Sequence, residues 1–137
     1  MGSLTKRVVE IHIPSELGYE KIPMVAVVVA TQRMGFKQER IDNLKMAVGE
    51  AVTNAIEHGN QCQSDLNVQI ILKIQANTLT VNVIDHAKQP IPEVPEKREE
   101  RPDYRGWGLT LIKEFMDEVT TTAELERNEI KMVAYLE

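Results

Sequence analysis

The sequence has one cysteine, no long apolar stretch and no excess of positive charge. The single cysteine, Cys62, excludes an internal disulfide and a zinc site built from several cysteines. The longest apolar run extends only from Met24 to Ala30, well short of the roughly 18 residues that a membrane span needs. No signal-peptide pattern precedes that run. These absences predict a soluble cytoplasmic protein.

Several common functional sites are also missing. The net charge of -5 and the isoelectric point near 5.3 argue against a nucleic-acid surface, which needs clustered lysine and arginine. The histidines share no metal-ligand spacing with one another or with Cys62, and no catalytic Ser-His-Asp or Cys-His set can be assembled. A Walker-type glycine loop is absent. An acidic protein can still bind an anion at a local backbone site.

The patterning indicates one globular domain spanning residues 1–137. Hydrophobic residues make up 42% of the chain and charged residues 27%, values typical of a folded domain with one core. Alternating and helical apolar spacings predict five strands and three helices. In chain order these are a strand at 8–13, helices at 24–35 and 37–59, strands at 67–75 and 79–85, a helix at 106–119, and strands at 120–125 and 130–136.

The order of these elements predicts a two-layer α/β sandwich: a mixed sheet with helices on one face. Gly35 and Gly59 fit left-handed caps after the first two helices, and Arg127-Asn128 fits the turn between the last two strands. Residues 86–105 hold four of the six prolines, which oppose both strand and helix. We interpret this segment as a lid or an insertion.

Two polar residues stand out on the second helix. Glu50 and Asn54 lie about 40° apart around the helix axis, away from the apolar stripe of Ile41 and Val48. Such residues are commonly only solvated. Gly49 beside them costs about 1 kcal/mol relative to alanine, and either marks close approach of a ligand or packs under a neighbouring helix.

Two further features could contribute to a site. Asp85 ends a strand and shares parity with Val81 and Val83, so it points to the covered face unless it turns to water or caps the next turn. Residues 105–109, Arg-Gly-Trp-Gly-Leu, place glycines where a loop meets a helix. Unpaired N–H groups there can bind a phosphate, although glycines are also common as hinges.

Taken together, these motifs resemble the GHKL ATPase superfamily. EAVTNAIEHGN (50–60) resembles its N-box, and RGWGLTLIKEFMDEV (105–119) its second glycine box with the following helix. VIDHAKQP (83–90) stands where the first glycine box belongs. Over essentially the whole chain, the sequence is most similar to anti-sigma-factor serine kinases of the RsbW type. The resemblance implies the Bergerat fold, with residues 86–105 as a lid over ATP.

The resemblance also implies the site residues. Glu50 would be the general base, and Asn54 would hold Mg²⁺ that bridges the nucleotide phosphates. Asp85 would accept a hydrogen bond from the adenine amino group, and Arg105 would offset phosphate charge. The other residues implied to contact the nucleotide are His58 of the N-box, Ala87 of the first glycine box, and Gly106, Trp107, Gly108 and Leu109 of the second.

The implied function is ATP-dependent phosphorylation of a serine on a STAS-type anti-sigma antagonist, together with sequestration of a sigma factor by a homodimer. Ala87 and Gln89 replace both glycines of the first box, which keeps a second function open: a binding module on the same fold that regulates a partner without phosphoryl transfer. The ATP-binding domain of a sensor histidine kinase is disfavoured, because the leading residues 5–14 read as a strand and not as a phospho-accepting helix.

Overall fold

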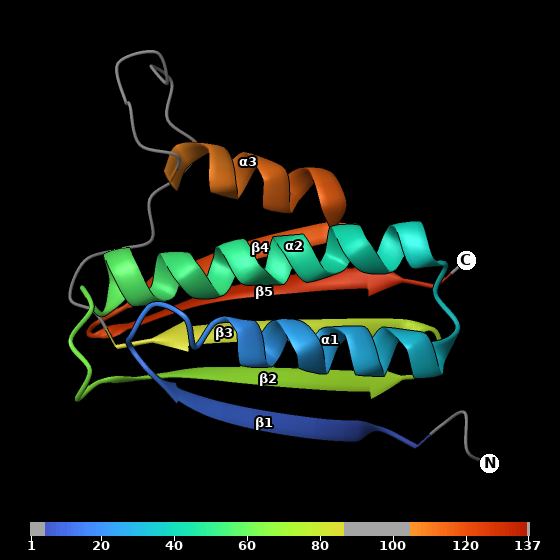
Figure 1. The fold of residues 1–137 in the computed structure, drawn as a ribbon, viewed down its shortest axis with the longest axis horizontal. Coiled ribbons are helices and arrows are strands. Elements are labelled where there is room, and N and C mark those ends of the chain that lie inside the picture. The colour runs from blue at the N-terminus through green and yellow to red at the C-terminus, as the bar shows by residue number, and fades with distance from the viewer. Residues whose placement is uncertain (1–4, 87–104, 137) are drawn as a thin grey trace.

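The computed structural model describes residues 5–86 and 105–136, and for 105–107 the backbone only. This part of the chain forms two layers, a five-stranded sheet with three helices on one face (Figure 1). The elements in chain order are β1 (Arg7–Pro14), α1 (Lys21–Met34), α2 (Gln38–Asn54), η2 (Ala55–Gly59), β2 (Asn67–Gln75), β3 (Thr78–Asp85), α3 (Arg105–Phe115), β4 (Glu118–Glu124) and β5 (Arg127–Tyr135). The predicted fold class and the predicted order of elements are confirmed.

The sheet has the strand order β1-β2-β3-β5-β4, and its four pairings are all antiparallel. The expectation of a mixed sheet was wrong in this respect. Tight turns at Ala76-Asn77 and Leu125-Glu126 force β2–β3 and β4–β5 to be antiparallel. Ala76 and Glu126 adopt φ values of 52° and 57° to make these turns.

The turn predicted at Arg127-Asn128 was also wrong, since both residues belong to β5. Asn128 is instead paired with Asp85 of β3 in the register of the sheet and is 1% exposed. The sequence correctly predicted a turn between the last two strands, but the residue that adopts the left-handed conformation in it is Glu126. The consequence is an amide side chain inside the sheet, next to a candidate site residue.

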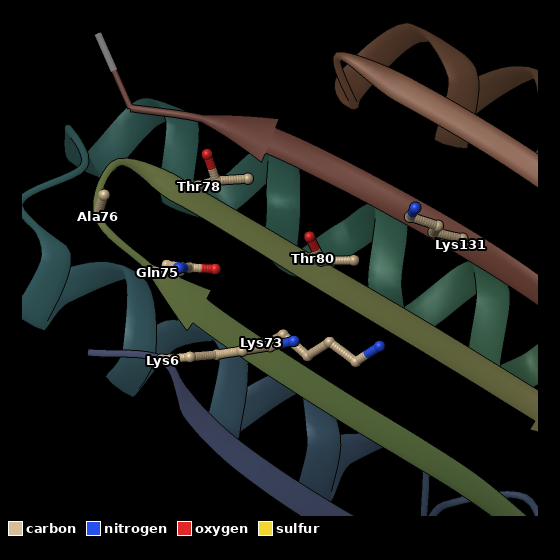
Figure 2. Close-up of a pocket in the computed structure, with 7 residues that line it drawn as sticks. All are labelled: Lys6, Lys73, Gln75, Ala76, Thr78, Thr80 and Lys131. Carbon is tan, nitrogen blue, oxygen red and sulfur yellow. The ribbon is translucent and has the colours of Figure 1, made fainter. Parts of the chain in front are cut away.

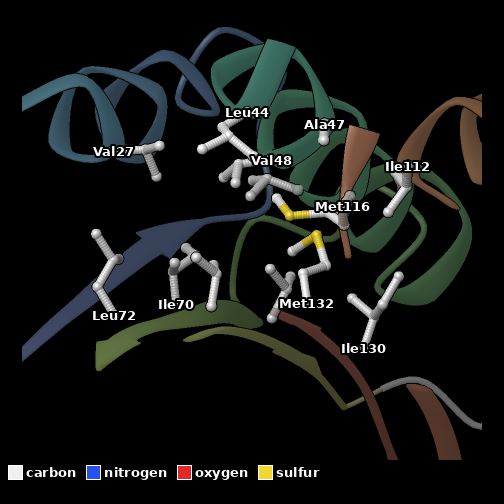
Figure 3. Packing of buried hydrophobic residues seen from close by; sticks show 14 of the residues in the cluster. Val27, Leu44, Ala47, Val48, Ile70, Leu72, Ile112, Met116, Ile130 and Met132 are labelled. Carbon is white, nitrogen blue, oxygen red and sulfur yellow. The ribbon is translucent and has the colours of Figure 1, made fainter. Parts of the chain in front are cut away.

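The core lies between α2 and the sheet. Leu44 and Val48 of α2 are fully buried above Ile70 of β2 and Met132 of β5, and Ile112 of α3 closes one side (Figure 3). The apolar stripe predicted for α2 therefore packs where helical phase placed it. No helix in the described ranges 5–86 and 105–136 combines the length and apolar character needed to cross a membrane.

A glycine at position 49 allows α1 to pack closely against α2. A Cβ atom there would lie 2.7 Å from Sδ of Met24 in α1, which is closer than van der Waals contact permits. Of the two interpretations left open by the sequence, the structure supports packing under a neighbouring helix. Gly35 ends α1 with φ 97°, so the predicted left-handed cap at that position is confirmed.

The end of α2 differs from the prediction. The chain continues from Asn54 directly into a π-helical turn, η2, in which the Asn60 N–H donates to the Ala55 carbonyl at 2.8 Å. Gly59 lies inside this turn, and it is not among the residues with positive φ, so its assignment as a left-handed cap was wrong. Single π turns within helices are rare and are frequently found at functional sites.

Candidate functional site

The polar edge of α2 faces the first turn of α3. A Cβ atom at Gly108 would lie 2.9 Å from Oε2 of Glu50 and 3.5 Å from Nδ2 of Asn54. Gly108 is itself buried, so only hydrogen at this position lets α3 approach these side chains. The structure therefore brings together Glu50, Asn54 and the second glycine of the RGWG motif, which the sequence places more than fifty positions apart.

Glu50 sits in surroundings that disfavour its charge. Partial burial raises the pKa of this carboxyl above its ordinary value, and the nearby carboxylate of Glu57 raises it further. A carboxylate with a raised pKa is a better proton acceptor near neutral pH than a solvated one. The helical phase of α2 thus gives Glu50 access to α3, and its surroundings raise its affinity for a proton.

Asp85 forms the other end of the site. The side chain is 3% exposed at the end of β3, and its Oδ1 accepts a hydrogen bond from Nδ2 of Asn128 at 3.1 Å. A buried carboxylate needs such donors to offset the loss of hydration. Asp85 therefore points to the helix-covered face, as its strand parity predicted.

Gly59 makes room for Asp85. A Cβ atom at Gly59 would lie 2.3 Å from both Cγ and Oδ2 of Asp85 and 2.7 Å from its Oδ1. No heavy atom could occupy that position while the carboxylate stays where it is. A glycine is therefore required at position 59 because Asp85, at the end of β3, packs directly against it. The sequence of the helix alone could not predict this contact.

We predict that Gly59→Ala displaces the Asp85 carboxylate. Overpacking at a buried, hydrogen-bonded site should lower the free energy of unfolding by about 1–3 kcal/mol. The affinity for ATP, which the sequence resemblance implies, should fall at least about tenfold because Asp85 loses its position. Chemical denaturation and calorimetric ATP titration measure the two effects.

Gly49→Ala is the matched control, since its Cβ would meet the flexible end of Met24. A methionine side chain can move aside at low cost, and alanine is the better helix former. ATP affinity in Gly49→Ala should stay at the wild-type value. Equal losses of ATP affinity in both variants would contradict a specific role for Gly59.

Asn60 ties the site to the surrounding strands. Its Nδ2 donates to Ser15 Oγ at 2.8 Å and to the Asn67 carbonyl at 3.1 Å, and its Oδ1 accepts from the His86 N–H at 3.0 Å. Asn60 is 1% exposed. These bonds hold the backbone that leaves β3 directly after Asp85. Neither Asn60 nor Asn128 was predicted as a site residue, because a lone asparagine carries no pattern that reveals such a contact.

The other expected site residues are placed as follows. His58 is part-buried within η2. Leu109 is 4% exposed and its side chain belongs to the core, so only its backbone can face the site. The backbones of Arg105, Gly106 and Trp107 form the first turn of α3, so the glycines lie inside the helix and not before it. Ala87, Gln89 and most of the expected lid lie outside the described residues.

Comparison with known proteins identifies the class of this protein. The family model described as Histidine kinase-like ATPase domain matches residues 14–134. This range contains every element from α1 to β4 and nearly all of β5. The chain therefore belongs to the histidine kinase-like ATPase family.

Within that family, the relatives are of the RsbW type that the sequence motifs indicated. Serine-protein kinase RsbW of Oceanobacillus iheyensis is 28% identical over 120 residues, which cover 81% of this chain and 76% of that protein. Anti-sigma F factor of Clostridium botulinum is 33% identical over 113 residues, which cover 79% of each chain. The resemblance to anti-sigma-factor serine kinases is thus confirmed.

Solved structures show the same fold. The RsbU and RsbW domains of a Mycobacterium tuberculosis protein match with a TM-score of 0.71 at 16% identity, over 95% of this chain and 32% of that longer one. The histidine kinase domain of a blue-light activated kinase from Erythrobacter litoralis matches with a TM-score of 0.57 at 18% identity, over 90% of this chain and 62% of that one. The fold of this chain is that of GHKL ATPase domains.

Proposed function

We propose that this protein is an ATP- and Mg²⁺-dependent serine kinase that also acts as an anti-sigma factor. Its substrate would be a serine of a small STAS-type antagonist in the cytoplasm. The observation that carries the proposal is the contact between α2 and α3, where Gly108 lies directly against Glu50 and Asn54. The names of its relatives, serine-protein kinase RsbW and anti-sigma F factor, support both activities.

The residues present fit a nucleotide with magnesium. The first N–H groups of α3 lack partners within the helix, as in any helix, and can donate to phosphate oxygens. No group of three or more His, Cys, Asp or Glu side chains in ranges 5–86 and 105–136 could hold a metal ion. A magnesium ion would therefore depend mainly on phosphate oxygens and water, with the Asn54 side-chain oxygen as a protein ligand, and such a set offers the oxygen ligands that this ion prefers. When bound, it would neutralise phosphate charge.

The chemistry asked of the protein is modest. Glu50 would take the proton of the serine hydroxyl as that oxygen bonds to the γ-phosphorus of ATP, while the bond to the β–γ bridging oxygen breaks and ADP leaves. Phosphoryl transfer depends mainly on positioning and charge stabilisation. Asp85 would position the adenine at one end of the site, and the first turn of α3 would hold the phosphates.

A second candidate function follows from the first glycine box. Ala87 and Gln89 stand where the RsbW-like pattern has glycines, which favours a binding module that regulates its partner without phosphoryl transfer. Incubation with γ-labelled ATP and the cognate antagonist separates the two functions. Label on an antagonist serine supports the kinase, whereas ATP binding without any transfer supports the binding module.

We also propose that the active form is a homodimer built on β1 and α1. β1 is an edge strand of eight residues whose outer backbone groups have no strand partner in the described sheet. Large apolar side chains around it and on the outer face of α1 are 43–61% exposed: Val8, Val9, Leu17, Tyr19, Ile22, Val25 and Val29. A stable dimer needs about 800 Å² from each protomer, which a strand and a 14-residue helix can provide together.

The double variant Val25→Lys/Val29→Lys should weaken this dimer by at least about 100-fold, since each valine buried in the interface contributes about 1.5–3 kcal/mol and both protomers carry the substitutions. Sedimentation equilibrium measures the change. Met46→Lys is the matched control, because Met46 is an apolar residue of α2 with a similar exposure of 47%. A wild-type protein that is monomeric, or a double variant that dimerises as tightly as Met46→Lys, would contradict the proposed interface.

A further inference from the structure

A pocket lies on the face of the sheet that carries no helices. Figure 2 shows its side chains on the near side of the sheet with the helices behind it. The pocket has a volume of about 440 Å³ and is lined by Lys6, Lys73, Gln75, Ala76, Thr78, Thr80 and Lys131. This volume falls within the range of small-molecule sites.

The strand register explains why the lysines share one face of the sheet. Lys73 of β2 pairs with Thr80 of β3, and Lys131 of β5 pairs with Asn82, two positions further along the same face of β3. Lys6 precedes β1 and reaches the pocket from the sheet edge. The pocket therefore draws on three strands and the segment before β1, and cation and hydroxyl donors dominate its lining.

The positive charge in this pocket is not neutralised by the protein. In the part of the chain that the structure describes, Lys6, Lys73 and Lys131 form no ion pair. Two acidic side chains further along this face have other partners: Glu10 accepts from Gln69 at 3.3 Å, and Glu129 lies 3.0 Å from Arg127. Three unpaired ammonium groups in one pocket repel one another, so an anion between them would relieve that repulsion.

We propose that this pocket binds a small, multiply charged oxyanion, either a phosphate compound or a polycarboxylate. Each ammonium group can donate up to three hydrogen bonds, and the Thr78 and Thr80 hydroxyls and the Gln75 amide add further donors. Compact ammonium groups suit phosphate and carboxylate oxygens as point charges. The site is separate from the proposed nucleotide site: it lies on the opposite face of the sheet, and Thr78 and Asp85 stand at opposite ends of β3.

The test is a titration of the ¹⁵N-labelled full chain with pyrophosphate and, separately, with citrate, in low salt without magnesium. We expect saturable amide shifts in residues 73–80 and around Lys131, distinct from any shifts near Asp85. Lys73→Gln and Lys131→Gln should each weaken binding about fivefold, the double variant should weaken it more, and about 0.3 M salt should weaken it further. Saturation by either probe supports the site and identifies its chemistry.

Lys21→Gln is the matched control, because Lys21 is an exposed lysine at the start of α1 and does not line the pocket. Its affinity for the anion should equal that of the wild type. Shifts that never saturate, or equal affinity in the wild type and the Lys73→Gln/Lys131→Gln variant, would overturn the proposal. Before titration, the amide spectrum of each variant should match that of the wild type away from the substituted positions. This match would show that the variant is folded, so that loss of binding is not caused by unfolding.

Discussion

Glu50→Gln is expected to slow phosphoryl transfer by orders of magnitude and leave ATP affinity near the wild-type value. The glutamine keeps the shape of the side chain but cannot take a proton, and loss of a general base typically slows a reaction by about 10²–10⁴-fold. Single-turnover transfer of label from ATP to the antagonist measures the rate, and calorimetric titration measures ATP affinity. The contact between Glu50 and Gly108 is preserved by the substitution, so α3 should stay in place.

Glu57→Gln is the matched control for this experiment. Glu57 lies about two helical turns further along, in η2, and also carries a carboxylate, but its contribution to the site is electrostatic, since it raises the pKa of Glu50. Transfer should persist in Glu57→Gln. Equal transfer rates in the Glu50→Gln and wild-type proteins would rule out Glu50 as the base, and loss of ATP binding in Glu50→Gln would assign it a binding role.

The raised pKa of Glu50 gives the rate of transfer a defined pH dependence. The base must be ionised, so the rate should fall as pH drops through a value above that of an ordinary glutamate. In Glu57→Gln this fall should move to lower pH, because one of the two causes of the shift is removed. A profile that is identical in both proteins would show that the two carboxylates do not interact.

The raised pKa of Glu50 also predicts that stability and the transfer rate depend on pH in opposite directions. Because the folded-state pKa is raised, the folded protein binds protons more readily than the unfolded chain, and stability is lost as pH rises through the folded-state value. Glu50→Gln removes this cost at neutral pH and should raise Tm on the order of 1–3 °C, a small effect since the side chain is partly solvated. The difference should vanish in acid, below the ordinary pKa of a glutamate.

Asp85→Asn is expected to lower ATP affinity by about 10–100-fold. Nδ2 of Asn128 donates to Oδ1 of Asp85, so the amide oxygen of the variant would be held at that position and its NH₂ group would replace Oδ2. A donor would then face the adenine amino group, which is itself a donor, and both groups would lose their hydrogen bond. Calorimetric titration with ATP measures the loss.

Asp65→Asn provides the control for charge, because Asp65 is exposed in the turn before β2 and also loses one carboxylate. Its ATP affinity should match the wild type. Circular dichroism of Asp85→Asn should show an intact fold, since asparagine can still accept the bond from Asn128. Normal ATP affinity in Asp85→Asn would mean that the adenine binds elsewhere.

Much of the geometry of the candidate site could be predicted because its residues belong to regular elements. The phase of α2 separated Glu50 and Asn54 from the apolar stripe, and the parity of β3 directed Asp85 to the covered face. The π turn could not be predicted, because residues 55–59 have an ordinary helical sequence. The turn before β5 was displaced for a similar reason: asparagine favours turns, yet the pairing of Asn128 with Asp85 outweighs that preference.

The sequence by itself determined the fold class, the faces of α2 and β3, and the motifs that identify the family, since periodicity and motif order are properties of neighbouring positions along the chain. Only the tertiary structure decided that Gly59 makes room for Asp85, that Gly108 meets Glu50, and that Asn128, 43 positions away, holds the Asp85 carboxylate. These are contacts between elements. They depend on how helices and strands pack, and the periodicity of neighbouring residues does not predict which side chain a glycine will contact.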